Sequence, residues 1–108
     1  KEKFRKKHKY TLDLIRFLVP HKNGLSRQLV LSRLEKERKA NDLPIPKTFT
    51  NTVQSAFNQY CGNSSVFVKR DAPEEQNLFW SLKDGNQSVW GVNLENARSW
   101  LNRNAGTE

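Results

Sequence analysis

The chain lacks the features that mark several large classes of protein. It has no Met, and its single cysteine, Cys61, has no partner for an internal disulfide, which fits a reducing compartment. Its apolar runs, such as residues 17–19, are far too short to span a membrane, and no segment resembles a signal peptide. We therefore expect neither a disulfide-stapled secreted domain nor a membrane-spanning protein.

Sequence patterns of catalysis and metal binding are absent as well. The two histidines, His8 and His21, have no Cys or carboxylate at ligand spacing, and no glycine-rich loop is present to hold a phosphate. Cys61 has no base near it in the sequence, and the acidic residues of 71–77 are typical of a solvated loop. We expect no enzyme, no metal site and no cofactor in this chain, and any catalytic domain would lie outside it.

What the chain does have is a strong excess of positive charge in one half. Residues 1–39 hold 13 Lys or Arg and 4 acidic residues, whereas residues 40–108 hold 6 and 7. So uneven a distribution suits a polyanionic partner, either nucleic acid or an anionic membrane surface. The alternative is a solvated basic tail that only keeps the domain soluble. The length of 108 residues predicts one domain, and the start at Lys1 suggests a piece of a longer protein.

Hydrophobic spacing and helix-ending residues predict three helices in the first sixty residues. Pro20 ends the first helix, whose apolar residues repeat at helical spacing. Ser26 is placed to cap a second helix, which ends at residues 40–42. A third helix is expected over 48–60, where Gly62 suits a left-handed cap just beyond its end.

The remaining residues predict a small sheet and a final helix. Residues 66–68 are β-branched or aromatic and predict a short strand. Strand-like runs at 78–83 and 88–92 flank Asp84-Gly85, which is a strong hairpin signal because the turn needs a positive φ. Apolar residues at helical spacing beyond residue 93 predict the last helix.

The predicted helix at 48–60 has an unusual polar face. Its apolar residues share one side, whereas the other side is rich in amide and hydroxyl groups and almost free of charge. A merely solvated face is usually rich in Lys and Glu, but a face that reads base edges needs the fixed donors and acceptors of Asn and Gln. The pattern is typical of a recognition helix, with an exposed polar face as the alternative. The polar side consists of Lys47, Asn51, Gln54, Ser55 and Asn58.

The predicted order of elements is that of an α+β winged helix. Such a fold has a three-helix helix-turn-helix core, a small antiparallel sheet with a wing hairpin, and a C-terminal helix. We expect a basic arm or frayed helical extension at 1–9, the winged-helix domain at 10–102 and a C-terminal tail at 103–108.

Short motifs add a resemblance to this pattern. Ser26, Pro44-Ile45-Pro46, Phe49 and Val89-Trp90 occupy the entrance of the second helix, the following loop, the start of the third helix and the end of the wing. In these features the chain resembles winged helix-turn-helix DNA-binding domains, and among them the N-terminal domains of Mrr-type restriction systems. The long loop at 40–47 and the acidic insert at 71–77 depart from the compact family pattern.

The resemblance implies that the third helix lies in the major groove and that the hairpin forms a wing. The base readers would be Asn51, Gln54, Ser55 and Asn58. The helix start and phosphate contacts would involve Lys47, Thr48, Thr50, Arg27 and Arg33. The wing would contribute Lys83, Asn86, Gln87 and Ser88, and the basic arm Lys3, Arg5, Lys6, Lys7 and Lys9. Because no Arg stands among the base readers, sites that contain adenine are expected. For each Lys or Arg and for the wing tip, the alternative is a merely solvated or turn-forming role.

The three tryptophans are a further feature of the composition. Trp80, Trp90 and Trp100 could stack on a flipped or modified base. Their spacing among apolar residues favours packing in the core instead. A methylated base could still be sensed without flipping, through apolar contact in the major groove.

The sequence therefore predicts a non-enzymatic module that binds duplex DNA and targets a larger nuclease or regulatory protein, with sensing of base modification as one variant. The alternatives are an RNA-binding winged helix, a protein–protein winged helix and a membrane-surface tether through residues 1–9. The tether lacks apolar anchors, so we expect no membrane partner. The expected location is intracellular, in the bacterial cytoplasm (nucleoid) or the nucleus.

Overall fold

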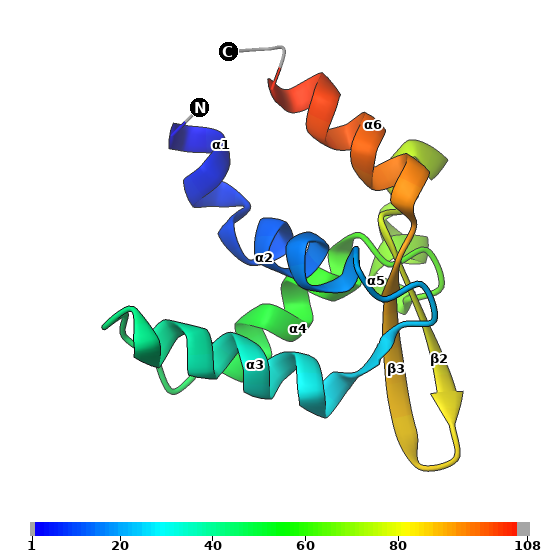
Figure 1. Cartoon of the computed structure of the whole chain (residues 1–108). Helices are drawn as coiled ribbons and strands as arrows, with labels where there is room; N and C mark the ends of the chain where they lie inside the picture. Colours follow the sequence, from blue (N-terminus) through cyan, green and yellow to red (C-terminus); the bar gives the residue numbers. More distant parts are fainter. Residues whose placement is uncertain (1, 106–108) are drawn as a thin grey trace.

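Helices and a small sheet alternate along residues 2–105, the part of the chain that the computed structural model describes (Figure 1). The helices are α1 (Glu2–Lys7), α2 (Lys9–Leu18), α3 (Arg27–Ala40), α4 (Phe49–Gln59), α5 (Ser65–Arg70), the 3₁₀ helix η1 (Glu74–Gln76) and α6 (Leu94–Ala105). The strands are β1 (Leu25–Ser26), β2 (Phe79–Asp84) and β3 (Gln87–Val92). The predicted α+β class is confirmed.

The three strands form one antiparallel sheet in the order β1-β3-β2, so the last strand in the sequence is the central one. β2 and β3 form the predicted hairpin, and Asp84 pairs with Gln87 at its tip. Of the two turn residues only Gly85 has a positive φ, of 64°, which is the pattern of a II′ turn. β1 was not predicted from the sequence, because two residues are too few to show a period.

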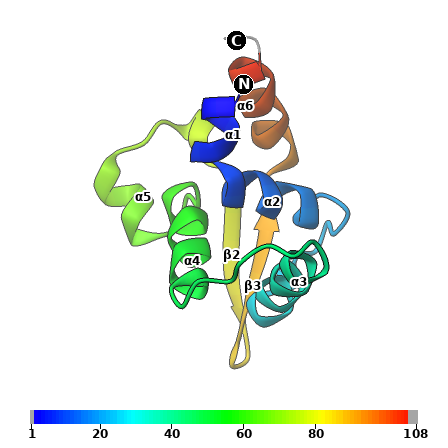
Figure 2. The same ribbon diagram turned by 90° about the vertical axis from the view of Figure 1, so that its left-hand side faces the viewer.

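The centre of the core is a stack of three aromatic rings. Phe57 on α4 lies nearly parallel to Trp90 on β3, with 4.0 Å between ring centroids, and to Phe79 on β2, at 5.0 Å. All three side chains are buried, and α2 and α3 contribute Leu14 and Val30 to the same core. This packing fixes α4 against the hairpin (Figures 1 and 2).

Residues 2–7 form a helix and not a flexible arm. Phe4 on α1 packs against Trp100 on α6, with 5.2 Å between ring centroids, and against His8, at 4.9 Å. Phe4 and His8 are four residues apart, so a helix brings both rings to one side. Of the two alternatives predicted for residues 1–9, the described residues 2–7 form the helical one, and α1 packs on α6. At the other end α6 continues through Ala105, and residues 106–108 of the predicted tail lie outside the described residues.

The predicted strand at residues 66–68 is wrong, since these residues lie in α5. The hydroxyl of Ser64 accepts a hydrogen bond from the Phe67 amide at 3.1 Å and caps the helix. Phe67 is buried, whereas Val66 and Val68 are exposed. A three-residue apolar run shows no clear strand period, and the adjacent cap decides in favour of a helical turn.

Gly62 does not adopt the predicted left-handed conformation. Among the described glycines, the positive φ angles belong to Gly24 and Gly85. A Cβ atom at Gly62 would lie 2.4 Å from the side chain of Asn77, which accepts a hydrogen bond from the Gly62 amide at 2.8 Å. The glycine is needed for this close approach.

Trp80 covers the face of the sheet that points away from α4. Because side chains alternate along a strand, Trp80 lies on the opposite face from Phe79. It pairs with Gly91 across the hairpin, and a Cβ atom on Gly91 would lie only 2.1 Å from its indole ring. A Cβ on Gly24 would lie 2.9 Å from the same ring. The half-exposed ring therefore packs against bare backbone.

This packing predicts that Gly91→Ala destabilises the protein through a clash with Trp80. We expect the free energy of unfolding to fall by about 1–3 kcal/mol, the usual cost of overpacking. In a Trp80→Ala background the same change should cost much less, since the ring is gone. Urea denaturation of the four proteins measures both values, with exposed Gln87→Ala as the control on the same strand. If Gly91→Ala lowers the free energy of unfolding equally in both backgrounds, a clash with the Trp80 ring is not the cause.

Candidate nucleic-acid interface

The polar face of α4 forms an exposed ridge, which we call the amide ridge and define as Asn51, Gln54, Ser55 and Asn58. The opposite side of the helix is held in the core by Phe49, Val53 and Phe57. Asn51 and Ser55 are exposed, whereas Gln54 and Asn58 are half-buried. The predicted division of the helix into two faces is confirmed, but the amide ridge itself is divided between two grooves.

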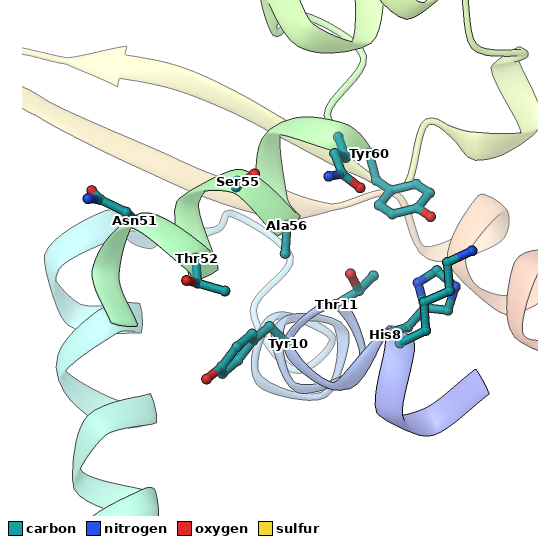
Figure 3. Close-up of a pocket in the computed structure, with 10 residues that line it drawn as sticks. His8, Tyr10, Thr11, Asn51, Thr52, Ser55, Ala56 and Tyr60 are labelled. Atoms are coloured by element: carbon teal, nitrogen blue, oxygen red, sulfur yellow. The ribbon is translucent and has the colours of Figure 1, made fainter. Parts of the chain in front are cut away.

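The first groove lies between α4 and the segment where α1 ends and α2 begins, and we call it the α1–α4 groove. It has a volume of about 480 Å³. Figure 3 shows His8, Tyr10 and Thr11 on one side, and Asn51 and Ser55 on α4. Lys7 adds a cation to its lining. The further lining residues are Thr52, Ala56, Gln59 and Tyr60.

The second groove, the α4–hairpin groove, lies between α4, the start of α3 and the inner face of the hairpin, and measures about 500 Å³. Gln54 and Asn58 line it from α4, and Arg27 from α3. Its remaining lining residues are Phe57, Asn63, Ser81, Leu82, Lys83, Ser88 and Trp90. The lining includes two cationic side chains and no carboxylate, so the groove favours an anion or a group rich in hydrogen-bond acceptors.

A hydrogen-bonded chain runs along this second groove. The Nε of Arg27 donates to the Oε1 of Gln54 at 2.5 Å, and the Nε2 of Gln54 lies 3.5 Å from the Oδ1 of Asn58. The guanidinium of Arg27 also lies over the indole of Trp90, 6.0 Å from its centroid. Arg27 was predicted as a phosphate clamp, and the structure instead gives it a half-buried position with an amide partner.

The predicted wing residues separate into two groups. Lys83 and Ser88 pair across the hairpin on its inner face and line the α4–hairpin groove. Asn86 and Gln87 are exposed at the tip. With Ser88, Ser26, Arg27 and Gln28 they line a smaller groove of about 110 Å³. The tip therefore lies close to the start of α3.

The residues predicted at the start of the recognition helix lie at the N-terminal end of α4. Lys47, Thr48 and Thr50 are exposed around the first turn of α4, and Thr48 is its N-cap residue without a side-chain cap bond. Arg33 is exposed on α3. Lys3, Arg5, Lys6, Lys7 and Lys9 are exposed on α1 and at the start of α2.

Several other basic residues are engaged within the molecule. Arg16 donates to Glu37 at 2.6 Å and to Asp13 at 3.2 Å, and these partners raise its pKa. Arg38 donates to the Pro44 carbonyl at 2.8 Å and so helps to hold the loop before α4. Arg70 donates to the Gln59 carbonyl at the end of α4. Among the described residues, the largest group of exposed cations that are neighbours in the sequence is the one at residues 3–9.

The basic helix α1 is held in place by a cluster of aromatic rings. His8 lies 5.2 Å from Trp100 and 6.1 Å from Tyr60, measured between ring centroids. Tyr60 directly follows α4, so the cluster joins α1, α4 and α6. Burial, and then the charge of Lys7, lower the pKa of His8.

The tryptophans follow the expected preference for packing in two of three cases. Trp90 and Trp100 are buried in the core. Trp80 is half-exposed on the outer face of the sheet, close to Leu82, which is 50% exposed. Among the tryptophans of the described residues, Trp80 is therefore the most exposed to solvent.

The thiol of Cys61 contacts Asn63 and Ser81, two residues that line the second groove. Cys61 is fully buried, and its thiol donates to the Oδ1 of Asn63 at 3.0 Å. Burial raises the pKa of this thiol, which disfavours the reactive thiolate. Within residues 2–105 no three His, Cys, Asp or Glu side chains gather as metal ligands would. None of the helices in this range combines the length and apolar content needed to cross a bilayer.

Sequence reasoning missed several groove residues. Asn63 lies in the second groove because its amide donates to the Ser81 carbonyl at 2.8 Å, which ties the turn after α4 to β2. His8 and Tyr60 reach the first groove through the aromatic cluster. These placements depend on contacts between distant segments, although the i, i+4 pair Phe4 and His8 was a local signal for α1.

The lowered pKa of His8 predicts that stability falls at acidic pH. Unfolded His8 takes up a proton near its ordinary pKa of 6.5, while folded His8 does so at lower pH, so protonation favours unfolding. Between about pH 7.5 and about pH 5 the free energy of unfolding should decrease, and less so in His8→Phe, which keeps the ring packing. Urea denaturation across this range measures the effect. The same pH dependence in both proteins would exclude His8 as its source.

Comparison of the chain with known protein families, with characterised proteins and with solved structures finds no match.

Proposed function

We propose that this chain is a duplex DNA-binding module of the winged-helix type, in which α4 reads bases and the β2–β3 hairpin is the wing. The observation that carries the proposal is the amide ridge of α4, which is partly exposed and lines two grooves whose linings include Lys7 in the first and Arg27 and Lys83 in the second. A major groove about 12 Å wide accepts an α-helix, and amide side chains match base edges. In this role the module would direct a larger nuclease or regulatory protein to DNA.

The strand order supports the winged-helix assignment. The helices α1 and α2, the short strand β1, the helices α3, α4 and α5 and the 3₁₀ helix η1 precede the hairpin. The short strand β1 pairs with the second hairpin strand. This arrangement holds the hairpin beside α4, where Lys83 and Ser88 face the amide ridge across the second groove. A helix in the major groove would bring the hairpin to the neighbouring phosphates or minor groove.

We assign the contacts with DNA phosphates to the cationic side chains on α1 and at the start of α4. Lys3, Arg5 and Lys6 are exposed on α1, and Lys7 lines the first groove beside the amide ridge. Because α1 is packed against α6, these charges have fixed positions relative to α4. Phosphate contacts of this kind supply affinity, while the amide ridge supplies discrimination.

RNA binding is a second candidate, favoured by the outer face of the sheet. Trp80 is half-exposed there and Leu82 is 50% exposed, and aromatic rings on sheets stack unpaired bases. One side of the Trp80 ring packs on Gly91, which leaves less of the ring for a base. We therefore rank duplex DNA first.

The first test measures how the affinity for duplex DNA depends on salt concentration. Replacing Lys6 and Lys7 by Ala should weaken duplex binding and reduce the slope of log affinity against log salt by about 1 for each phosphate that the variant no longer neutralises. The matched control replaces Lys22, in the turn before β1, and Arg98, on α6, and removes the same charge. Binding is measured by fluorescence anisotropy across a salt series. Equal slopes for both double variants would show that α1 has no specific part in DNA binding.

The second test concerns base reading. Duplexes selected from a randomised pool by the wild-type protein should lose about ten-fold or more in affinity on Asn51→Ala with Ser55→Ala, since each good base contact contributes about 1–3 kcal/mol of discrimination. Unselected duplexes should lose much less. The control is Ser99→Ala with Asn102→Ala on exposed positions of α6. If selected and unselected duplexes weaken equally, α4 does not read bases through these residues. A preference for single-stranded RNA that Trp80→Ala abolishes would favour the second candidate.

A further inference from the structure

The hydrogen-bonded chain from Arg27 through Gln54 to Asn58 has a fixed direction. A guanidinium only donates, so the atom of Gln54 that faces Arg27 at 2.5 Å must be its amide oxygen. The amide nitrogen of Gln54 then faces Asn58, whose nearest atom, at 3.5 Å, is in turn its oxygen. A single donor at the start of α3 therefore sets the orientation of two side chains on α4.

This direction decides what the α4–hairpin groove offers to a ligand. The oxygens of Gln54 and Asn58 accept within the hydrogen-bonded chain, and Gln54 uses one amide hydrogen for Asn58. The second amide hydrogen of Gln54 and both amide hydrogens of Asn58 remain for a ligand. The terminal nitrogens of Arg27 and the ammonium of Lys83 are also donors, and both residues line the groove. The lining contains no carboxylate, so the groove presents donors from several sides.

We propose that Arg27 is a positioning residue that makes this groove select guanine over adenine at the base that faces Gln54 and Asn58. The proposal rests on the proposed duplex DNA-binding function and specifies its base preference. In the major groove guanine presents two acceptors, N7 and O6, whereas adenine presents an acceptor and a donor. An amide recognises adenine by accepting with its oxygen and donating with its nitrogen. The Gln54 oxygen is directed to Arg27 and its nitrogen to Asn58, so this two-bond pairing with adenine is disfavoured for Gln54. The remaining amide hydrogens of Gln54 and Asn58 match the two acceptors of guanine.

Amide side chains alone predicted adenine, whereas the fixed orientation of the Gln54 amide predicts guanine. The prediction of adenine took each Asn and Gln as free to present either atom. The half-buried position of Gln54 and the packing of Arg27 over Trp90 remove this freedom. A phosphate is also rich in acceptors, and a phosphate in this groove would strengthen binding to all sequences equally.

The decisive variant is Arg27→Met, which keeps a long side chain over Trp90 but cannot hold the Gln54 oxygen. The matched control, Arg33→Met, removes one positive charge from the same helix at an exposed position. Each protein selects duplexes from a randomised pool, and affinities are then measured with the enriched guanine intact, replaced by adenine, or replaced by 7-deazaguanine, which lacks the N7 acceptor. Urea denaturation establishes that each variant is folded.

We expect wild type and Arg33→Met to prefer guanine over both replacements by about five-fold or more, the lower end of a good base contact. Arg27→Met should accept guanine and adenine nearly equally. As a second variant, Gln54→Glu keeps an oxygen for Arg27 but replaces the amide donor by a carboxylate oxygen, and should lose the guanine preference even if Arg27→Met does not fold.

Three results would overturn the inference. Enrichment of adenine by the wild type would show that Gln54 pairs with its oxygen free. An unchanged guanine preference in both Arg27→Met and Gln54→Glu would remove the two residues from base selection. Binding of all sequences with equal affinity would place a phosphate in the groove and leave the DNA-binding function intact. Loss of the proposed function itself is a different result, because the wild type would then show no salt-dependent binding to any duplex.

Discussion

The structure depends above all on the stacking of Phe57 between Phe79 and Trp90. One ring from α4 is held between rings from the two hairpin strands, at 5.0 and 4.0 Å between centroids, and all three are buried. Aromatic pairs of this kind contribute about 0.5–1.5 kcal/mol beyond the burial of their area. Because Phe57 lies one turn from Val53 on the same face, the stack fixes the rotation of α4 as well as its position. The direction of the amide ridge follows from this constraint.

A second aromatic group performs a similar task for the charged part of the surface. Phe4, His8, Tyr60 and Trp100 join α1, the end of α4 and α6. The lysines of α1 are long and flexible, but the backbone that carries them is fixed next to α4. The positive charges of α1 therefore have defined positions relative to α4, and Lys7 lines the first groove together with Asn51 and Ser55.

Periodicity in the sequence was sufficient to predict which side of α4 is buried. The apolar positions Phe49, Val53 and Phe57 and the hairpin around Gly85 are found as expected, and Trp90 and Trp100 lie in the core. Periodicity does not say which neighbour covers an apolar side. The docking of Phe4 on Trp100 and the pairing of Leu25 with Trp90 join segments far apart in the sequence. For this reason neither the packing of α1 on α6 nor the strand β1 was predicted.

The candidate site was predicted in composition but not in arrangement. The four amide-ridge residues lie on the exposed side of α4, yet Gln54 and Asn58 turn toward the hairpin while Asn51 and Ser55 line the other groove. The two pairs lie on neighbouring rows of the helix, since the members of each pair are four residues apart. The orientation of the Gln54 amide depends on Arg27, which is positioned next to β1 and over the face of Trp90. The spacing of residues along one helix cannot reveal a hydrogen-bond donor that a different helix supplies.

The short strand β1 has a thermodynamic consequence for any ligand in the second groove. Ser26 pairs with Val89 on the central strand, and the next residue, Arg27, lines the groove. The pairing of β1 with β3 therefore fixes the position of Arg27. The groove is built from the start of α3, from α4 and the turn after it, and from the hairpin, and it is lost if any of these segments separates. A ligand held there binds only when these segments are folded together, and its binding free energy adds to the stability of this part of the domain. Ligand binding and cooperative folding are thus linked in this small protein through a strand of two residues.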